Sequence, residues 1–202
     1  MRRLKQIIAF SVVISILAIS ICVLAAVPNP VPDTGQTQSF TNTFGEDSDY
    51  TTHPPLYTKL DAQGNPLLDT DPSWSMVKDN VTGLIWENKT DDGTIHDKDT
   101  SYTWDNVESD FITTLNTPPG FGGFTDWRLP TVKELSFIVN RGNSGTAINT
   151  AYFPNTISFY YWSSTTYPNS SSKAWCVSFG NSDVGPGSKS SGYYVRAVRS
   201  GQ

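Results

Sequence analysis

Cysteine and histidine are the scarcest chemically active residues in this 202-residue chain, with two of each. The cysteines are Cys22 and Cys176, and the histidines are His53 and His96. Cys22 lies in an apolar N-terminal run, so the chain after that run holds a single cysteine and can form no intrachain disulfide. That part must therefore be held together by its core. Neither a Ser-His-Asp nor a Cys-His catalytic set can be assembled from so few histidines.

Basic residues are also few, and they are unevenly placed. The formal net charge is −5. Residues 27–120 hold 4 Lys or Arg against 16 Asp or Glu, whereas residues 121–202 hold 7 against 3. We favour the interpretation that the two halves pack together and partly neutralise each other; the alternative is a basic C-terminal face for an anionic ligand. An acidic chain without a basic stripe excludes nucleic acid as a partner.

The N-terminus has the pattern of an export signal. Basic residues precede an uncharged apolar run from Ile7 to Val27, and Ala25-Ala26 suits a cleavage site. About 20 apolar residues are also enough to span a membrane. We therefore predict a signal peptide or N-terminal membrane anchor over residues 1–26, and a protein exported across the bacterial inner membrane to the periplasm, the cell surface or the medium. The membrane is contacted only through this segment.

Two further divisions follow from composition. Residues 27–54 are rich in Pro, Thr, Ser and acidic residues and bury too little apolar surface to order themselves, so we predict a disordered linker. Residues 55–202 form one domain. Within it, an acidic loop carries Asp91, Asp92, Asp97 and Asp99. Carboxylates suit calcium, but their spacing matches no EF-hand, so we favour an acidic surface loop and predict no metal site.

Local patterns predict strands and two helices. The strands cover residues 57–60, 74–79, 84–87, 159–166, 174–179 and 193–199, and a Gly/Ser-rich loop covers 185–192. Apolar residues from Trp104 to Leu115 recur with helical spacing. Thr131 and Glu134 form a capping box, which predicts a second helix ending at Asn140-Arg141-Gly142, with Gly142 in the left-handed C′ position.

Six ordered motifs within this pattern resemble one family. They are Val81-Thr82-Gly83-Leu84-Ile85-Trp86, Thr103-Trp104, Asp126-Trp127-Arg128-Leu129-Pro130-Thr131 with Glu134-Leu135, Tyr161-Trp162-Ser163-Ser164, Ala174-Trp175 and Val195-Arg196-Ala197-Val198-Arg199. Together they resemble the Lcl C-terminal domain family, named after a collagen-like adhesin, over about residues 56–202.

The resemblance implies an α+β fold that is C-type-lectin-like, as in formylglycine-generating enzymes: two helices, a small mainly antiparallel sheet, long loops, and paired first and last strands. It also implies adhesion and binding of sulfated glycosaminoglycans. Many relatives carry a cysteine where this chain has Ala197. If those relatives form a disulfide there, this domain must replace it by packing.

We therefore predict a non-enzymatic binding module without a cofactor, whose partner is an anionic polysaccharide or surface glycan. Aromatic faces hold sugars and cations hold their acidic groups. The ligand candidates, all on or beside the late strands, are Trp162, Ser163, Ser164, Tyr167, Lys173, Trp175, Lys189 and Tyr193. Residues expected to be structural are Trp86, Trp104 and Trp127 in the core, Arg128 in a buried ion pair or a bond to the backbone, and the capping pair Thr131 and Glu134.

Two alternatives remain open. The first is that the domain is a protein-interaction or assembly module of the envelope, with its aromatic C-terminal strands as the contact face. Less favoured is an enzyme, because the resemblance extends to copper-dependent formylglycine-generating oxidases. Those need two cysteines, and Cys176 stands alone in a predicted strand, where a buried inert thiol is usual.

Overall fold

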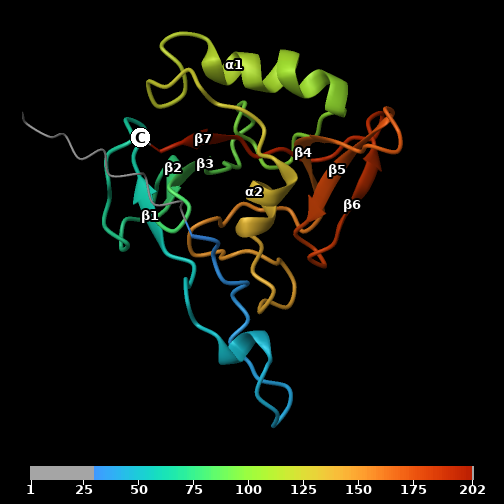
Figure 1. Cartoon of the computed structure of the whole chain (residues 1–202). Helices are drawn as coiled ribbons and strands as arrows, with labels where there is room; N and C mark the ends of the chain where they lie inside the picture. Colours follow the sequence, from blue (N-terminus) through green and yellow to red (C-terminus); the bar gives the residue numbers. More distant parts are fainter. Residues whose placement is uncertain (1–29, 202) are drawn as a thin grey trace, which may run out of the picture.

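The computed structural model describes residues 30–201, and the predicted leader or anchor over residues 1–26 lies outside them. The described chain is a small α+β fold with two antiparallel sheets and few helices, as Figure 1 shows. The predicted single sheet is thus two separate sheets. Within residues 30–201, no helix is long and apolar enough to cross a membrane.

The first sheet contains the three early strands and the last one. Its order is β1 (Tyr57–Leu60), β2 (Met76–Asp79), β3 (Leu84–Glu87) and β7 (Val198–Ser200). The first and last strands share this sheet but do not pair, because β7 adds to β3 and β1 pairs only with β2. Asp79 organises the β2–β3 turn: its carboxylate accepts from the Val81 amide at 2.9 Å and from the Thr82 hydroxyl at 2.6 Å.

The second sheet consists of β4 (Tyr160–Thr166), β5 (Lys173–Ser178) and β6 (Val184–Ser188). Strand β6 occupies a stretch predicted as loop, since glycine and proline disfavour strands. They fit here because β6 is an edge strand, where Pro186 interrupts no further ladder. Gly187 is needed for packing, because a Cβ there would lie 2.5 Å from Tyr193 and 2.9 Å from Trp162.

The two predicted helical segments are present. The first runs through a 3-10 helix (Trp104–Asn106), a π-helix (Val107–Ile112) and α1 (Thr113–Asn116), and lies over one side of both sheets (Figure 1). It buries Val107, Phe111 and Leu115 at helical spacing. The apolar periodicity therefore located this segment correctly.

Helix α2 (Val132–Phe137) begins at the predicted capping box and ends earlier than predicted. The Thr131 amide donates to the Glu134 carboxylate at 2.7 Å, and the Glu134 amide donates to the Thr131 hydroxyl at 3.3 Å. The helix stops because the Asn140 amide donates to Ala147 and the Arg141 amide to Thr34 instead of to helical carbonyls. The prediction of a left-handed Gly142 is wrong: its φ is not positive, and it packs against the Gly35 carbonyl.

Two clusters of buried side chains join the sheets. One contains Trp86, Leu135 of α2, Tyr161 and Val177. The other lies beneath the first helical segment and contains Phe111, Trp127, Trp162 and Cys176. Strand β4 contributes to both, with Tyr161 on one face and Trp162 on the other. Both faces of the second sheet are therefore covered over much of its length.

Residues 30–54, predicted as a linker, project from the end of the domain opposite α1 (Figure 1). Their only helical turn is the 3-10 helix Asp47–Asp49. The Asp33 carboxylate accepts from the amides of Thr52 and His53, each at 3.0 Å, and so closes the base of this segment. That residues 27–54 act as a disordered linker stays a prediction.

Candidate functional site

A cleft of about 580 Å³ opens between the first helical segment and the chain that leads into α2. Three separate stretches of the chain meet there. The residues that line the cleft are Trp104, Asp105, Val107, Glu108, Arg128, Leu129, Thr131 and Ser164. They combine one aromatic ring, two aliphatic side chains, two hydroxyls, one guanidinium and two carboxylates.

The indole of Trp104 forms one wall of the cleft. Its ring is half-buried, and its Nε1–H donates to the Ser163 carbonyl at 2.8 Å, which fixes the ring plane. The Nζ of Lys189 lies 3.8 Å from the ring centroid, in a cation–π contact. We predicted Trp104 as a core residue, but it is only partly buried and also lines the cleft.

A planar ion pair forms the next part of the cleft. Arg128 donates to both Glu134 oxygens, at 2.9 Å and 2.7 Å, and also to the Leu129 carbonyl. Burial alone would raise the pKa of Glu134, but the hydrogen bonds from Arg128 and Thr131 outweigh it and hold that pKa below its usual value. Arg128 was predicted to form a buried ion pair or to bond to the backbone, and the structure shows both an ion pair and a backbone hydrogen bond. The expected burial is wrong, since the Arg128 side chain is 42% exposed.

Both hydroxyl groups that line the cleft donate hydrogen bonds to oxygens of the protein. Ser164 Oγ donates to the Pro130 carbonyl at 3.2 Å, and Thr131 Oγ1 donates to Glu134 at 2.9 Å. Each hydroxyl oxygen keeps acceptor capacity toward the cleft. The carboxylates of Asp105 and Glu108 are exposed, and within residues 30–201 neither makes an ion pair or accepts a hydrogen bond.

The predicted ligand residues separate into buried and surface groups. Trp162 and Ser163 are both 0% exposed. Trp162 Nε1 donates to the Tyr102 carbonyl at 2.9 Å, and Ser163 Oγ donates to the Trp175 carbonyl at 2.7 Å. A buried ring has no face for a sugar, so we reassign both residues to the framework. Strand β4 has a bulge after Trp162, and this bulge turns Ser164 toward the cleft.

The other candidates do not form one site. Tyr167 and Trp175 pack edge to face, with centroids 5.2 Å apart, near the exposed Lys173. Tyr193 stacks on Tyr160 at 5.3 Å, on the face of the sheet that carries Trp162. Of the predicted set, Ser164 lines the cleft and Lys189 lies beside it.

Much of the basic charge in residues 121–202 is used inside the domain. Arg196 is fully buried and donates to the Glu87 carbonyl at 2.7 Å. Arg199 is buried against Phe124 and pairs with Asp126 at 2.7 Å. Arg128 pairs with Glu134, so both ion pairs of these arginines lie within residues 121–202. Among residues 30–201 no ion pair joins the two halves, and their mutual neutralisation stays a prediction.

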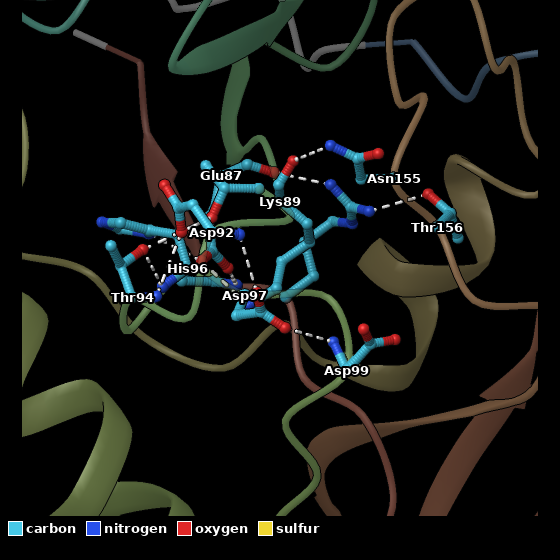
Figure 2. A network of polar contacts seen from close by, with 12 residues as sticks. Glu87, Lys89, Asp92, Thr94, His96, Asp97, Asp99, Asn155 and Thr156 are labelled. Atoms are coloured by element: carbon cyan, nitrogen blue, oxygen red, sulfur yellow. Dashed lines mark hydrogen bonds and ion pairs between the residues drawn. The ribbon is translucent and has the colours of Figure 1, made fainter.

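The largest group of buried charges surrounds Glu87 (Figure 2). Its carboxylate accepts from Lys89 Nζ at 3.1 Å, from His96 Nδ1 at 2.8 Å and from the Ala197 amide at 3.0 Å. Burial alone would raise the pKa of Glu87, but the positive charge of Lys89 and the hydrogen bond of His96 hold it below its usual value. The carboxylate of Glu87 is occupied by partners within the domain, so we assign the network to the framework.

The acidic loop that precedes the first helical segment also uses its carboxylates internally. Asp97 accepts from the amides of Asp92 and Asp99 (Figure 2) and from the amide of Gly93. Lys98 bridges Asp91 and Asp99. No group of three or more potential metal ligands occurs within residues 30–201.

Cys176 is buried, and its thiol donates to the Gly185 carbonyl. Burial raises its pKa to about 11, so the thiolate that would be reactive is scarce at neutral pH.

Four residues that line the cleft were not predicted as ligand residues: Asp105, Val107, Glu108 and Leu129. A signal for one of them was present, because Trp104 and Glu108 are four residues apart and therefore share one helical face. Nothing in the sequence placed that face opposite Arg128 and Ser164.

Comparison with known proteins identifies a family for this chain. No curated protein matches the sequence. The family model of the Lcl C-terminal domain matches residues 75–199, which include the whole cleft and both sheets except β1 and the last residue of β7. The chain therefore belongs to the Lcl C-terminal domain family.

Proposed function

We propose that this domain is a non-enzymatic, adhesin-like binding module that holds a carbohydrate in the Trp104 cleft. The observation that carries the proposal is a half-buried indole wall beside fixed polar groups in an open cleft of about 580 Å³. Sugars present C–H faces to aromatic rings and hydroxyls to hydrogen-bonding groups, and binding clefts combine apolar walls with a few placed polar groups. Membership of the Lcl C-terminal domain family and the C-type-lectin-like fold implied by the resemblance support this reading.

A binding role suits the chemistry of the cleft better than catalysis. Asp105 and Glu108 lie three residues apart on one helical segment and are both exposed. General acid catalysis by a carboxyl needs a buried, apolar setting, and a pair of catalytic carboxylates flanks the bond to be broken. Arg128 and Glu134 are occupied with each other.

The N-terminal sequence supports an extracytoplasmic location. A basic start, an uncharged apolar run to Val27 and an acidic segment after it suit an exported protein whose domain stands away from the membrane or surface. A binding module at the cell surface or in the periplasm would meet glycans there.

A glycan array tests this proposal, using sulfated, uronic-acid, neutral and amino-sugar polymers. Sulfated and uronic-acid polymers are included because the charge of residues 121–202 predicted an anionic ligand, for which the exposed Lys173 and the adjacent Lys189 would be the contacts. Ser164→Tyr fills the cleft, and Thr166→Tyr places the same ring at another exposed position of β4. Circular dichroism checks that both variants fold.

We expect Ser164→Tyr to abolish the array signals and Thr166→Tyr to retain them. Signals that survive Ser164→Tyr would move the site away from the cleft. An array without signals for the native protein would refute glycan binding. If light scattering then showed a stable oligomer, the assembly-module alternative would take its place.

A further inference from the structure

We infer that the ligand of the Trp104 cleft is a polysaccharide of amino sugars with free, protonated amines, rather than a sulfated or uronic-acid polymer. This inference rests on the proposed function and narrows it. It is drawn from the charge and the hydrogen-bonding capacity of the cleft.

The side chains that line the cleft carry a negative balance. Arg128 is neutralised by Glu134 through two hydrogen bonds. Asp105 and Glu108 are exposed, and neither has a partner within residues 30–201. Lys189 contacts the ring of Trp104 but is not among the residues that line the cleft. A sulfate or carboxylate would therefore meet two unpaired negative charges.

The hydrogen-bonding groups of the cleft lead to the same conclusion. Thr131 and Ser164 have donated their hydroxyl hydrogens to protein oxygens and offer acceptors to a ligand. Asp105 and Glu108 offer acceptors only. Arg128 is the one lining side chain that still holds donors, and three of its hydrogen bonds go to Glu134 and Leu129. Ammonium and hydroxyl groups are donors, whereas sulfate and carboxylate groups bring acceptors alone.

The aromatic wall is compatible with such a ligand. An ammonium group already lies 3.8 Å from the centroid of Trp104, at Lys189. An indole attracts a cation through its ring face and also packs against the C–H face of a sugar. An amino sugar carries both groups on one ring.

A sugar fits better than a lysine side chain of a protein partner. A lysine brings one ammonium group and an apolar stem, and this leaves the acceptors of Thr131 and Ser164 without ligand donors. The hydroxyls of successive sugar rings can reach several of these acceptors while one amine faces Asp105 and Glu108. A cleft of about 580 Å³ is large enough for a small ligand of this kind.

Isothermal titration calorimetry on the full chain tests the inference at low salt and mildly acidic pH. The ligands are a glucosamine oligomer, its fully N-acetylated counterpart of equal length, a heparin oligosaccharide and a tri-lysine peptide. Two exposed carboxylates facing an ammonium group predict a preference for the free amine of about five- to tenfold over the acetylated oligomer, which fades as NaCl is raised.

Two double variants locate the effect. Asp105→Asn with Glu108→Gln removes both charges from the cleft. Asp110→Asn with Asp183→Asn removes two exposed charges elsewhere. We expect the first pair to erase the preference for the amine and the second pair to retain it.

The other outcomes separate the two proposals. The native protein could bind the glucosamine oligomer and its acetylated counterpart equally, with Ser164→Tyr abolishing both. That result would overturn the charge inference and leave the proposed function standing. Tighter binding of heparin than of the glucosamine oligomer would also overturn it. Tighter binding of tri-lysine would replace the sugar by a basic protein segment. If no oligosaccharide bound, the proposed function itself would fall.

Discussion

Replacing the buried carboxylate of Glu87 should destabilise the domain more than any surface change. Glu87 is 0% exposed and accepts hydrogen bonds from Lys89, His96 and the Ala197 amide. Glu87→Ala leaves the Lys89 ammonium, whose side chain is 3% exposed, without its carboxylate, and leaves the Ala197 N–H without an acceptor. Removing one partner of a buried ion pair costs about 3–5 kcal/mol, because the remaining charge stays buried. That is a large share of the roughly 5–15 kcal/mol by which domains are stable.

Urea unfolding followed by tryptophan fluorescence measures this loss. The control is Glu87→Gln combined with Lys89→Met, which removes both charges and keeps an acceptor for the Ala197 amide. Replacing a buried pair by uncharged residues is often nearly neutral, so we expect this double variant to recover at least half of the loss. A loss below about 1 kcal/mol in Glu87→Ala would show that the network does not carry the stability we assign to it.

The same variant tests how the stabilisation by Glu87 depends on pH, and the direction of its pKa shift determines the direction of the effect. The folded pKa of Glu87 lies below its usual value, so its stabilising contribution is present above the unfolded pKa of about 4.3. It is lost as the pH falls through the lower folded pKa. The difference in unfolding free energy between the native protein and Glu87→Ala should therefore narrow in acid. A difference that grows in acid would contradict this reasoning.

Three further outcomes follow from the packing of the second sheet. Trp162→Ala should cost about 3–5 kcal/mol in unfolding free energy, because it empties a fully buried site; a folded variant of native stability would return Trp162 to the ligand candidates. Gly187→Val should lower the urea midpoint by an amount equivalent to about 1–3 kcal/mol, since a Cβ there would overlap Tyr193 and Trp162, whereas Gly185→Val, with open space around it, should not. Cys176 should react with a thiol reagent only after unfolding, because its thiol is buried and its pKa is raised to about 11; fast reaction of the native protein would contradict this.

Local signals in the sequence located most of the secondary structure. The strand-forming residues of 57–60 and 84–87 and the capping box at Thr131 depend on neighbouring residues only, and both strands and the capping box are present in the structure. The end of α2 depends instead on amide partners at Thr34 and Ala147, far from it in sequence. Such an end cannot be derived from the helix sequence itself.

The burial of β4 shows why ligand residues were misplaced. Strand periodicity places Tyr161 and Trp162 on opposite faces of the sheet. If one face of the sheet were free, one of the two residues would face solvent. Here both faces are covered, and the two residues are 1% and 0% exposed. An aromatic strand in one sequence therefore does not reveal whether its rings bind a ligand or fill a core.

The cleft also depends on contacts that no local pattern encodes. Its walls come from residues 104–108, from residues 128–131 and from Ser164. Trp104 reaches the third stretch through the hydrogen bond to Ser163, and Ser164 reaches the second through the Pro130 carbonyl. Sequence analysis identified most of these stretches as motifs, but only their juxtaposition shows that they enclose a cleft.

The motif residues of the cleft combine a framework contact with a surface that lines the cleft. Trp104 is anchored by Ser163, Arg128 by Glu134, and the Ser164 amide donates to Pro130 at 2.8 Å. Substituting any of them disturbs packing as well as binding, so loss of binding alone would not identify a contact. Asp105 and Glu108 have no such anchor within residues 30–201, and a change there alters the charge of the cleft without altering its walls. Exchanging these two helical positions should therefore change the ligand preference of this domain while its fold stays the same.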